Sequence, residues 1–344
     1  MAYGVQPSLL YIALVKTASE VCRIPEIKTF IAQARKPWGL CGITFVYGSD
    51  WMSLINEKVD LLEIPVELKE KVIHFIRPIA LKIKEWLTYH TDLLQCNSSA
   101  VHLQNSLQWR TNGTIDDHKT GICLARNENL SLEDRFLLSQ VYYLEDDAYA
   151  LGKQQPGIPQ NAVSIEEFRC SAYETMMEML EANFSIYNKL REFYCNSPGV
   201  LKHFFTKVDP SEKFDILKKF MDNNSAEMKV IHFSFMELSE KERQRLYERY
   251  ASVFLISFLE WPLQHNLLAV ADLVWSFICK EDFLDLLEFI YKERIEKSWE
   301  EYDYIGLLRN FWLKGPEDFR DFVLYCDNFL RQISTEPLGF LKLV

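Results

Sequence analysis

Apolar residues recur every three or four positions through most of the chain, which is the spacing of one face of an α-helix. The pattern is clearest from residue 238 onwards. There Ser239 and Glu242 form a capping box, in which two side chains satisfy free N–H groups at the start of a helix. The apolar positions that follow are Leu246, Tyr250, Val253 and Phe254. A long helix is therefore predicted from Ser239.

Proline and glycine divide the rest of this C-terminal segment. Pro262 lacks a backbone donor, so it ends the helix before it. Segments with the same order of start, apolar stripe and end then follow at residues 262–278, 281–297 and 302–313. Gly315 and Pro316 close the last of these and open a final helix, as glycine and proline prefer.

The N-terminal two thirds have the same character. Helices are predicted at residues 8–23, 25–35, 50–63, 65–76, 78–94, 97–112, 131–151, 164–181, 183–194, 198–208, 211–222 and 226–236. Ser164 starts a second capping box. Loops are expected where glycine, proline or charged residues gather, at residues 37–49, 111–126 and 152–159.

The longest apolar tract, residues 251–278, resembles a membrane span in composition only. A span requires about 20 uninterrupted apolar residues. Glu260, His265 and Asp272 lie inside this tract, and Pro262 divides it. We therefore expect two buried helices and no membrane span.

Two short patterns recur in the same order, which indicates an internal duplication. Residues 190–204 match residues 308–322 at an offset of 118, and residues 130–135 match residues 238–243 at an offset of 108. The loop around Pro156 in the first copy accounts for the difference. Helix junctions made of a cap and a proline look alike in unrelated helices, which is the alternative explanation.

The prediction for the fold is an all-α chain of stacked antiparallel helical hairpins. A fainter third copy from Ser8 to Lys82 extends it to a solenoid-like array of two or three related units, each of about 110 residues. The predicted units are a divergent N-terminal one at residues 1–129, a second at 130–237 and a C-terminal one at 238–344.

Composition agrees with a globular helical chain. Of the 344 residues, 48% are hydrophobic and 14% aromatic, and only 12 are glycine and 12 proline, few for a protein rich in β-turns. The net charge of −11 disfavours nucleic acid, whose binding depends on Lys and Arg. Residues 281–303 carry nine acidic and three basic side chains. They form either a solvated helix face or a docking face for a basic protein partner.

The cysteines give an indication of the compartment. All eight are isolated from one another, without a C-x-x-C pair, and we interpret them as reduced thiols of a cytoplasmic protein. Cys22 and Cys279 in particular are expected among apolar helix residues. Secretion is the alternative, because five N-x-S/T sequons begin at Asn97, Asn112, Asn129, Asn183 and Asn223.

Two acidic clusters were considered as sites of chemistry. Helical enzymes that bind magnesium use carboxylates four residues apart, since these share a face. Asp146 and Asp147 are followed at that distance by Ala150 and Leu151, so Glu145 and its two neighbours do not fit a magnesium site. The second cluster, residues 116–118, places His118 in a predicted loop without further ligands.

Other catalytic patterns are not found in the sequence. The seven histidines include no H-x-x-x-H pair, and there is no glycine-rich phosphate loop or G-x-S-x-G motif. Six tryptophans spaced singly along helices favour packing over stacking on bases: Trp86, Trp109, Trp261, Trp275, Trp299 and Trp312. No catalytic, cofactor-binding or metal-binding residue is predicted, although a site assembled from distant residues would leave no such signal.

Several of these packing motifs together resemble a known family. They are Leu130-Ser131-Leu132-Glu133-Asp134-Arg135-Phe136, Tyr142-Tyr143-Leu144-Glu145-Asp146-Asp147, and the segment from Phe311-Trp312 to Phe322. With these motifs the C-terminal two thirds of the chain resemble a large multigene family of uncharacterised all-helical proteins from spiders. The resemblance implies a helical fold and no particular activity.

These observations lead to one expectation and two alternatives. The expectation is a non-enzymatic protein that binds another protein through a surface of its helices. An all-helical enzyme whose site is assembled from distant residues is the first alternative, and a secreted effector is the second.

Overall fold

The chain folds into helices, and the all-α prediction is confirmed. The computed structural model describes residues 8–34, 49–94, 100–154, 208–222 and 228–325, with residues 202 and 205. In these ranges every regular element is helical, and the only β-type pairing is an isolated bridge between Trp109 and Ile115. The described helices belong to two compact units, and the boundary between them along the chain falls between Ile216 and Leu217, inside α12 (Pro210–Asp222).

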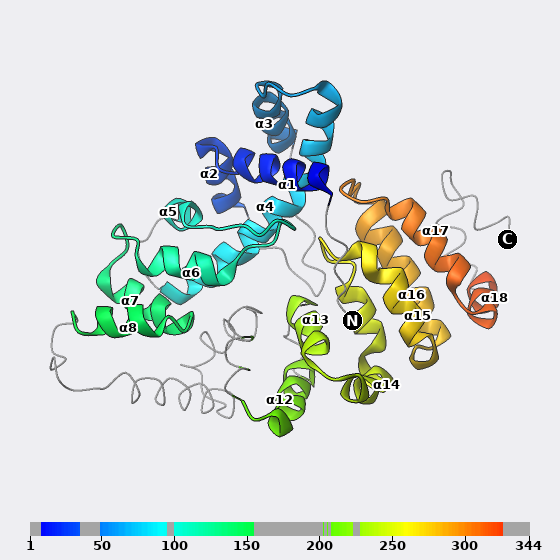
Figure 1. Cartoon of the computed structure of the whole chain (residues 1–344). Coiled ribbons are helices and arrows are strands. Elements are labelled where there is room, and N and C mark those ends of the chain that lie inside the picture. Colours follow the sequence, from blue (N-terminus) through cyan, green and yellow to red (C-terminus); the bar gives the residue numbers. More distant parts are fainter. Residues whose placement is uncertain are drawn as a thin grey trace. The chain divides into compact units, whose positions relative to one another are not determined.

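The N-terminal unit is built around one long helix (Figure 1). Its helices are α1 (Leu9–Val21), α2 (Pro25–Gln33), α3 (Ser49–Asp60), α4 (Val66–Leu94), α5 (Ala100–Asn105), α6 (Asp117–Ala125), α7 (Leu132–Val141) and α8 (Glu145–Gly152). The long helix α4 packs against α1, α2, α3 and α5, while α6, α7 and α8 pack in succession. Aromatic contacts reinforce this packing, as where Tyr11 meets Phe75 edge to face at 5.3 Å.

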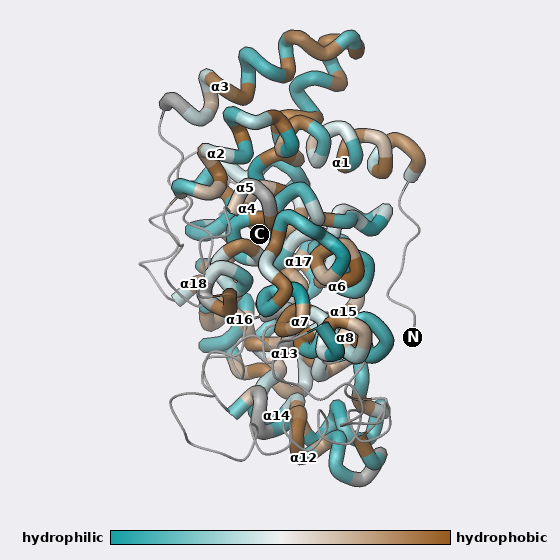
Figure 2. Tube along the Cα trace, turned by 90° about the vertical axis from the view of Figure 1, so that its left-hand side faces the viewer, coloured by the Kyte–Doolittle hydropathy of each residue, from teal (hydrophilic) through white to brown (hydrophobic). Residues whose placement is uncertain are grey.

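The described helices of the C-terminal unit pack as a series of neighbouring pairs. Its elements are α13 (Met228–Glu237), α14 (Glu240–Ser257), η1 (Gln264–Asn266), α15 (Leu267–Val274), η2 (Trp275–Phe277), α16 (Lys280–Ile290), η3 (Tyr291–Ile295), α17 (Tyr304–Lys314) and α18 (Glu317–Tyr325). Helix α14 packs on α13, α15 and α16, and α16 packs in turn on α17 and α18. Figure 2 shows apolar and polar positions alternating along these helices, as expected of elements buried on one side.

Aromatic rings fill much of the C-terminal core. Phe235 stacks on Phe254 with ring centroids 4.1 Å apart, and Phe283 stacks on Phe311 at 5.3 Å. The Phe283 ring also explains the glycine at residue 315. A Cβ atom on Gly315 would lie 2.6 Å from that ring, so only glycine fits there. Its φ of −60° is ordinary, and close packing is therefore the reason for this glycine.

Serine caps start the helices where the sequence predicts them. The side chains of Ser8, Ser131 and Ser239 accept a hydrogen bond from the backbone N–H three residues later, at 3.1, 3.0 and 3.4 Å. At Ser239 the Glu242 carboxylate completes the capping box, accepting from the Ser239 N–H at 2.8 Å. The predicted helices beginning at residues 8, 131 and 239 are confirmed.

Several predicted boundaries are wrong. Pro78 does not separate two helices but lies buried inside α4, because helical residues on both sides pack against the rest of the unit. The predicted loop at residues 111–126 contains α6, since the Asp116 side chain caps it by accepting from the Lys119 N–H. Of the described residues in the helix predicted over 97–112, only the six of α5 are helical. Residues 262–278 divide into two 3₁₀ turns around α15.

Some predictions fall outside the described residues. They concern the loop at residues 37–48, the capping box at Ser164 and the helices at 164–181, 183–194 and most of 198–208. The first copy of the predicted duplication lies largely in this part of the chain, so the repeat and the unit boundaries at residues 130 and 238 stay predictions.

Candidate interaction surface on the C-terminal unit

The acidic segment predicted from the sequence begins at a helix that is capped by a cysteine. Cys279 precedes α16, and its thiol accepts from the Asp282 N–H at 3.4 Å and donates to Asp282 Oδ2 at 3.1 Å. The same carboxylate accepts from the Cys279 N–H at 3.0 Å. Cys279 is exposed, so its predicted place among apolar residues is wrong, whereas Cys22 is buried as predicted.

Four carboxylates gather along α16, and we call them the acidic α16 surface: Glu281, Asp282, Asp285 and Glu288. Glu281, Asp285 and Glu288 are four and three residues apart, which places them on one helix face. Partial burial raises the pKa of Asp285, and the neighbouring charges of Glu288, Asp282 and Glu281 raise it further. These carboxylates therefore repel one another at neutral pH.

Lysines neutralise part of the acidic segment. Lys292 pairs with Glu288 and Lys297 pairs with Glu293, each with its Nζ 2.5 Å from a carboxylate oxygen and four residues away on the helix. Two of the three basic residues counted in this segment are thus engaged by acids of the same segment.

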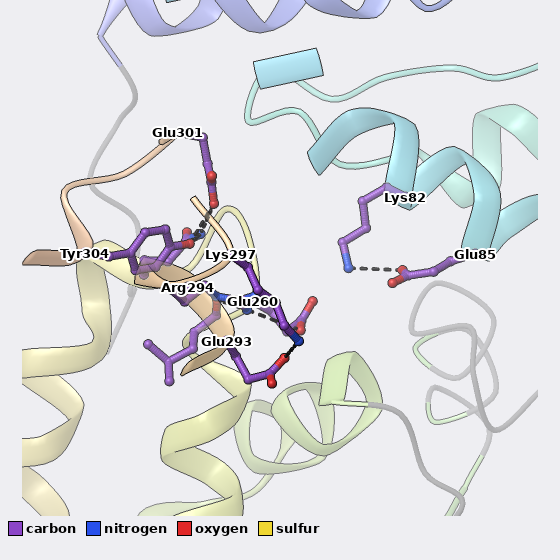
Figure 3. A network of polar contacts seen from close by, with 10 residues as sticks. Lys82, Glu85, Glu260, Glu293, Arg294, Lys297, Glu301 and Tyr304 are labelled. Atoms are coloured by element: carbon purple, nitrogen blue, oxygen red, sulfur yellow. Dashed lines mark hydrogen bonds and ion pairs between the residues drawn. The ribbon is translucent and has the colours of Figure 1, made fainter. Parts of the chain in front are cut away.

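The third basic residue, Arg294, points into the protein. Its side chain is 3% exposed, and its Nη2 donates to the Leu259 carbonyl at 2.7 Å and lies 3.7 Å from the Glu260 carboxylate. Three aromatic rings surround the guanidinium at centroid distances of 5.3 to 5.9 Å: Trp299, Tyr304 and Phe289. Buried arginine is stabilised by such contacts with ring faces. Figure 3 shows Arg294 close to Glu260 and Tyr304.

Hydrogen bonds link Gln264, Tyr304 and Glu301 beside this arginine. Gln264 Nε2 donates to the Tyr304 hydroxyl at 2.8 Å, and that hydroxyl donates to Glu301 Oε1 at 2.6 Å (Figure 3). Burial raises the pKa of Tyr304 well above its usual range, with the Glu301 charge adding to the effect and Arg294 opposing it. Glu301 therefore serves an internal contact, and its side chain is less exposed than those of Glu296 and Glu300.

The local backbone is what turns Arg294 inward. The five residues of η3 form a π-helix with hydrogen bonds from Glu296 N to Tyr291 O at 2.9 Å and from Trp299 N to Arg294 O at 3.0 Å. A π-helical turn contains more residues than an α-helical one and so rotates the side chains that follow. The sequence gives no signal for this turn, because its residues suit an ordinary α-helix.

The other clusters considered from the sequence have structural partners. Asp147 accepts two hydrogen bonds from Arg126, at 2.9 and 3.1 Å, and Asp116 caps α6. His118 is exposed, as predicted, but lies in the first turn of α6 and not in a loop. Across the described ranges no group of three or more His, Cys, Asp and Glu side chains could hold a metal ion.

Two of the five sequon asparagines can be placed. Asn129 is exposed, and Asn112 is half-buried with its Oδ1 accepting from the Thr114 N–H and hydroxyl at 3.1 and 2.8 Å. Asn97, Asn183 and Asn223 lie outside the described residues.

The class that fold and surface define is an all-α protein with an acidic helix face. No helix among the described residues has the length and apolar character needed to cross a membrane. No protein-family model matches the chain, no curated protein is similar to it, and no solved structure matches its fold. The resemblance to the spider family stays a prediction.

Proposed function

We propose that this chain is a non-enzymatic protein that binds a basic segment of another protein through the acidic α16 surface. The observation that carries the proposal is the gathering of four carboxylates on α16, of which Glu281 and Asp285 are exposed. Partial burial raises the pKa of Asp285, and the repulsion between these carboxylates raises it further. A cationic partner would relieve this repulsion. It would also favour the ionised form of Asp285, so binding is expected to weaken as the pH falls and this carboxyl takes up a proton.

The arrangement around Arg294 supports the same proposal. The charge count of the sequence sets three basic residues against nine acids, but Arg294 is buried and directed at Glu260. The internal contact of Glu301 removes one carboxylate in the same way, so the solvent-facing side keeps its excess of acids. Charged surfaces of this kind steer oppositely charged partners and set the rate of association.

The secreted-effector alternative retains one supporting observation. Asn129 is exposed and begins the sequon Asn129-Leu130-Ser131, so its side chain is accessible for glycosylation. A mobility shift of the natural protein on treatment with an N-glycosidase, absent in Asn129→Gln, would favour secretion.

The test of the proposal is recovery of partners from native tissue with the full chain as bait. The variant Glu281→Lys/Asp285→Lys reverses two exposed charges of the acidic α16 surface. The matched control, Glu237→Lys/Glu248→Lys, makes the same change of net charge at two exposed residues of the same unit. Loss of the partner with the first variant alone supports the proposal. Equal recovery with both variants would contradict it.

A further inference from the structure

The turn that joins α3 to α4 is apolar yet unburied. It comprises residues 61–66, which we call the apolar turn: Leu61, Leu62, Glu63, Ile64, Pro65 and Val66. Five of these six residues are apolar, and none of the six is buried. Leu61 is 74% exposed and Val66 is 76% exposed. Figure 1 shows the turn at the end of the α3–α4 hairpin, and Figure 2 colours much of it as hydrophobic.

This composition is unusual for a connection between helices. Turns generally use Gly, Asn, Asp and Ser, whose side chains suit tight backbone geometry and solvent. Single exposed apolar residues are common, but adjacent ones that form a patch mark contact sites. The apolar turn therefore has the character of a surface that another molecule covers.

Exposed carboxylates frame the apolar turn. Asp60, Glu63, Glu67 and Glu70 are all exposed, and their side chains make no hydrogen bond or ion pair with any residue that the structure describes. Their charge is therefore available to a partner.

Most nearby lysines are already engaged. Lys58 lies 3.0 Å from carboxylate oxygens of both Glu26 and Glu57, and Lys69 donates to the Asp60 carbonyl at 2.6 Å, at the end of α3. Lys71 is the exposed exception. The frame is acidic overall, with five acids against three lysines from Glu57 to Lys71.

The hairpin presents the turn on a rigid support. On α3 the side chains of Trp51, Ile55 and Val59 are each at most 1% exposed and share one inward face. The turn is closed by hydrogen bonds from Leu62 N to Val59 O at 3.0 Å and from Leu68 N to Pro65 O at 3.0 Å. A preformed surface binds without an ordering cost.

We propose that the apolar turn is a docking site for a segment of another protein that carries apolar side chains flanked by lysine or arginine. The exposed leucine and valine match the apolar side chains, and the four carboxylates match the cations. A second copy of this chain fits less well, because a two-fold interface would bring two acidic frames together. An anionic lipid surface would repel the same carboxylates.

The probe is a random-peptide library displayed on phage, selected against the full chain. Selected peptides are then synthesised and their affinities measured by fluorescence anisotropy for the wild type and Leu61→Ser/Val66→Ser. The control is Leu313→Ser, which removes an exposed leucine from the other unit. Both variants change exposed residues, and circular dichroism verifies that each keeps the helical content.

The expected peptides contain apolar residues next to Lys or Arg, bind the double variant at least about tenfold more weakly than the wild type, and bind Leu313→Ser unchanged. Charge reversal by Glu63→Lys/Glu67→Lys should weaken the same peptides by a similar factor.

Three results would overturn the proposal. The first is a selection of peptides without basic residues, or of peptides whose affinity is unchanged by Leu61→Ser/Val66→Ser. The second is cosedimentation with vesicles of phosphatidylcholine and phosphatidylserine that the double variant abolishes. The third is a wild-type dimer in analytical ultracentrifugation that the double variant converts to a monomer.

Discussion

Cys279 performs with a thiol the task that a hydroxyl or carboxylate performs at other helix starts in this chain, such as Ser239 and Asp303. The pKa of this thiol is raised. The Asp282 N–H acts to lower it, but partial burial and the carboxylates of Asp282 and Glu281 outweigh that effect. The thiol therefore stays protonated at neutral pH and serves as a weak cap.

A stronger hydrogen-bonding group at residue 279 should therefore stabilise the start of α16 at least as well as the thiol does. Cys279→Ser is expected to leave the free energy of unfolding unchanged or slightly raised, and Cys279→Ala to lower it by about 1 kcal/mol because the cap is lost. Urea unfolding measures both. Equal stability of the two variants would show that the cap is unimportant.

The reactivity of the thiols gives an independent test of the burial of Cys22 and the exposure of Cys279. Burial raises the pKa of Cys22 far above its usual range, whereas Cys279 is exposed. Reaction of the native chain with Ellman's reagent should be reduced by one thiol in Cys279→Ser and unchanged in Cys22→Ala. The opposite pattern would contradict the placement of these residues.

His232 makes the stability of the chain depend on pH. Burial lowers the pKa of His232 to about 4, and its ring meets Phe258 edge to face at 4.7 Å. The neutral form is favoured in the folded state, so this contribution is complete above the unfolded pKa, about 6.5, and is lost as the pH falls towards 4.

His232→Phe should accordingly flatten the acid limb of the stability curve. The wild type is expected to lose about 2 to 3 kcal/mol more than the variant between pH 7 and pH 4. Chemical unfolding at a series of pH values measures this difference. Parallel curves for the two proteins would be inconsistent with a buried neutral histidine.

Among the elements, helix starts at serine caps were predictable, whereas α6 and the interruptions of helices were not. A serine cap is a local signal, because the side chain bonds to a backbone group three residues away. The helix break predicted at Pro78 is wrong. A proline inside a helix removes one backbone hydrogen bond, but the packing of α4 on both sides of Pro78 stabilises the rest of the helix. Helix α6 was missed because its two charged starting residues and its glycine resemble a loop in sequence.

The π-helical turn η3 lies within the acidic segment, and its Arg294 side chain holds it against the rest of the unit. The contribution of Arg294 to stability can be tested. Arg294→Leu should lower the free energy of unfolding by about 3 kcal/mol, because Glu260 and the Leu259 carbonyl lose a charged partner. Arg294→Lys should also destabilise, since an ammonium cannot stack on the rings as a guanidinium does. Lys241→Ala, at an exposed residue, is the control. Stability equal to that of the control would remove the anchoring role of Arg294.

For the whole molecule, the sequence predicted helical class and surface acidity but not which acids face solvent. Those features follow from composition and periodicity, which are properties of the chain itself. Arg294 turns inward to Leu259 and Glu260, which follow α14, and Glu301 lies within hydrogen-bond distance of Gln264 in η1. These partners are distant in sequence from η3 and Glu301. A variant of Glu301 chosen from charge alone would have disturbed an internal network and not a binding surface.

The most direct test of the account is the dissociation constant of a recovered partner for the full chain and for Glu281→Lys/Asp285→Lys, measured at low and at high salt. The account predicts an affinity at least about tenfold weaker for the variant at low salt, and a smaller dependence on salt, because two attractive charges become repulsive. The Glu237→Lys/Glu248→Lys control should stay near the wild type. Identical dissociation constants for the acidic-surface variant and the wild type would contradict the central claim.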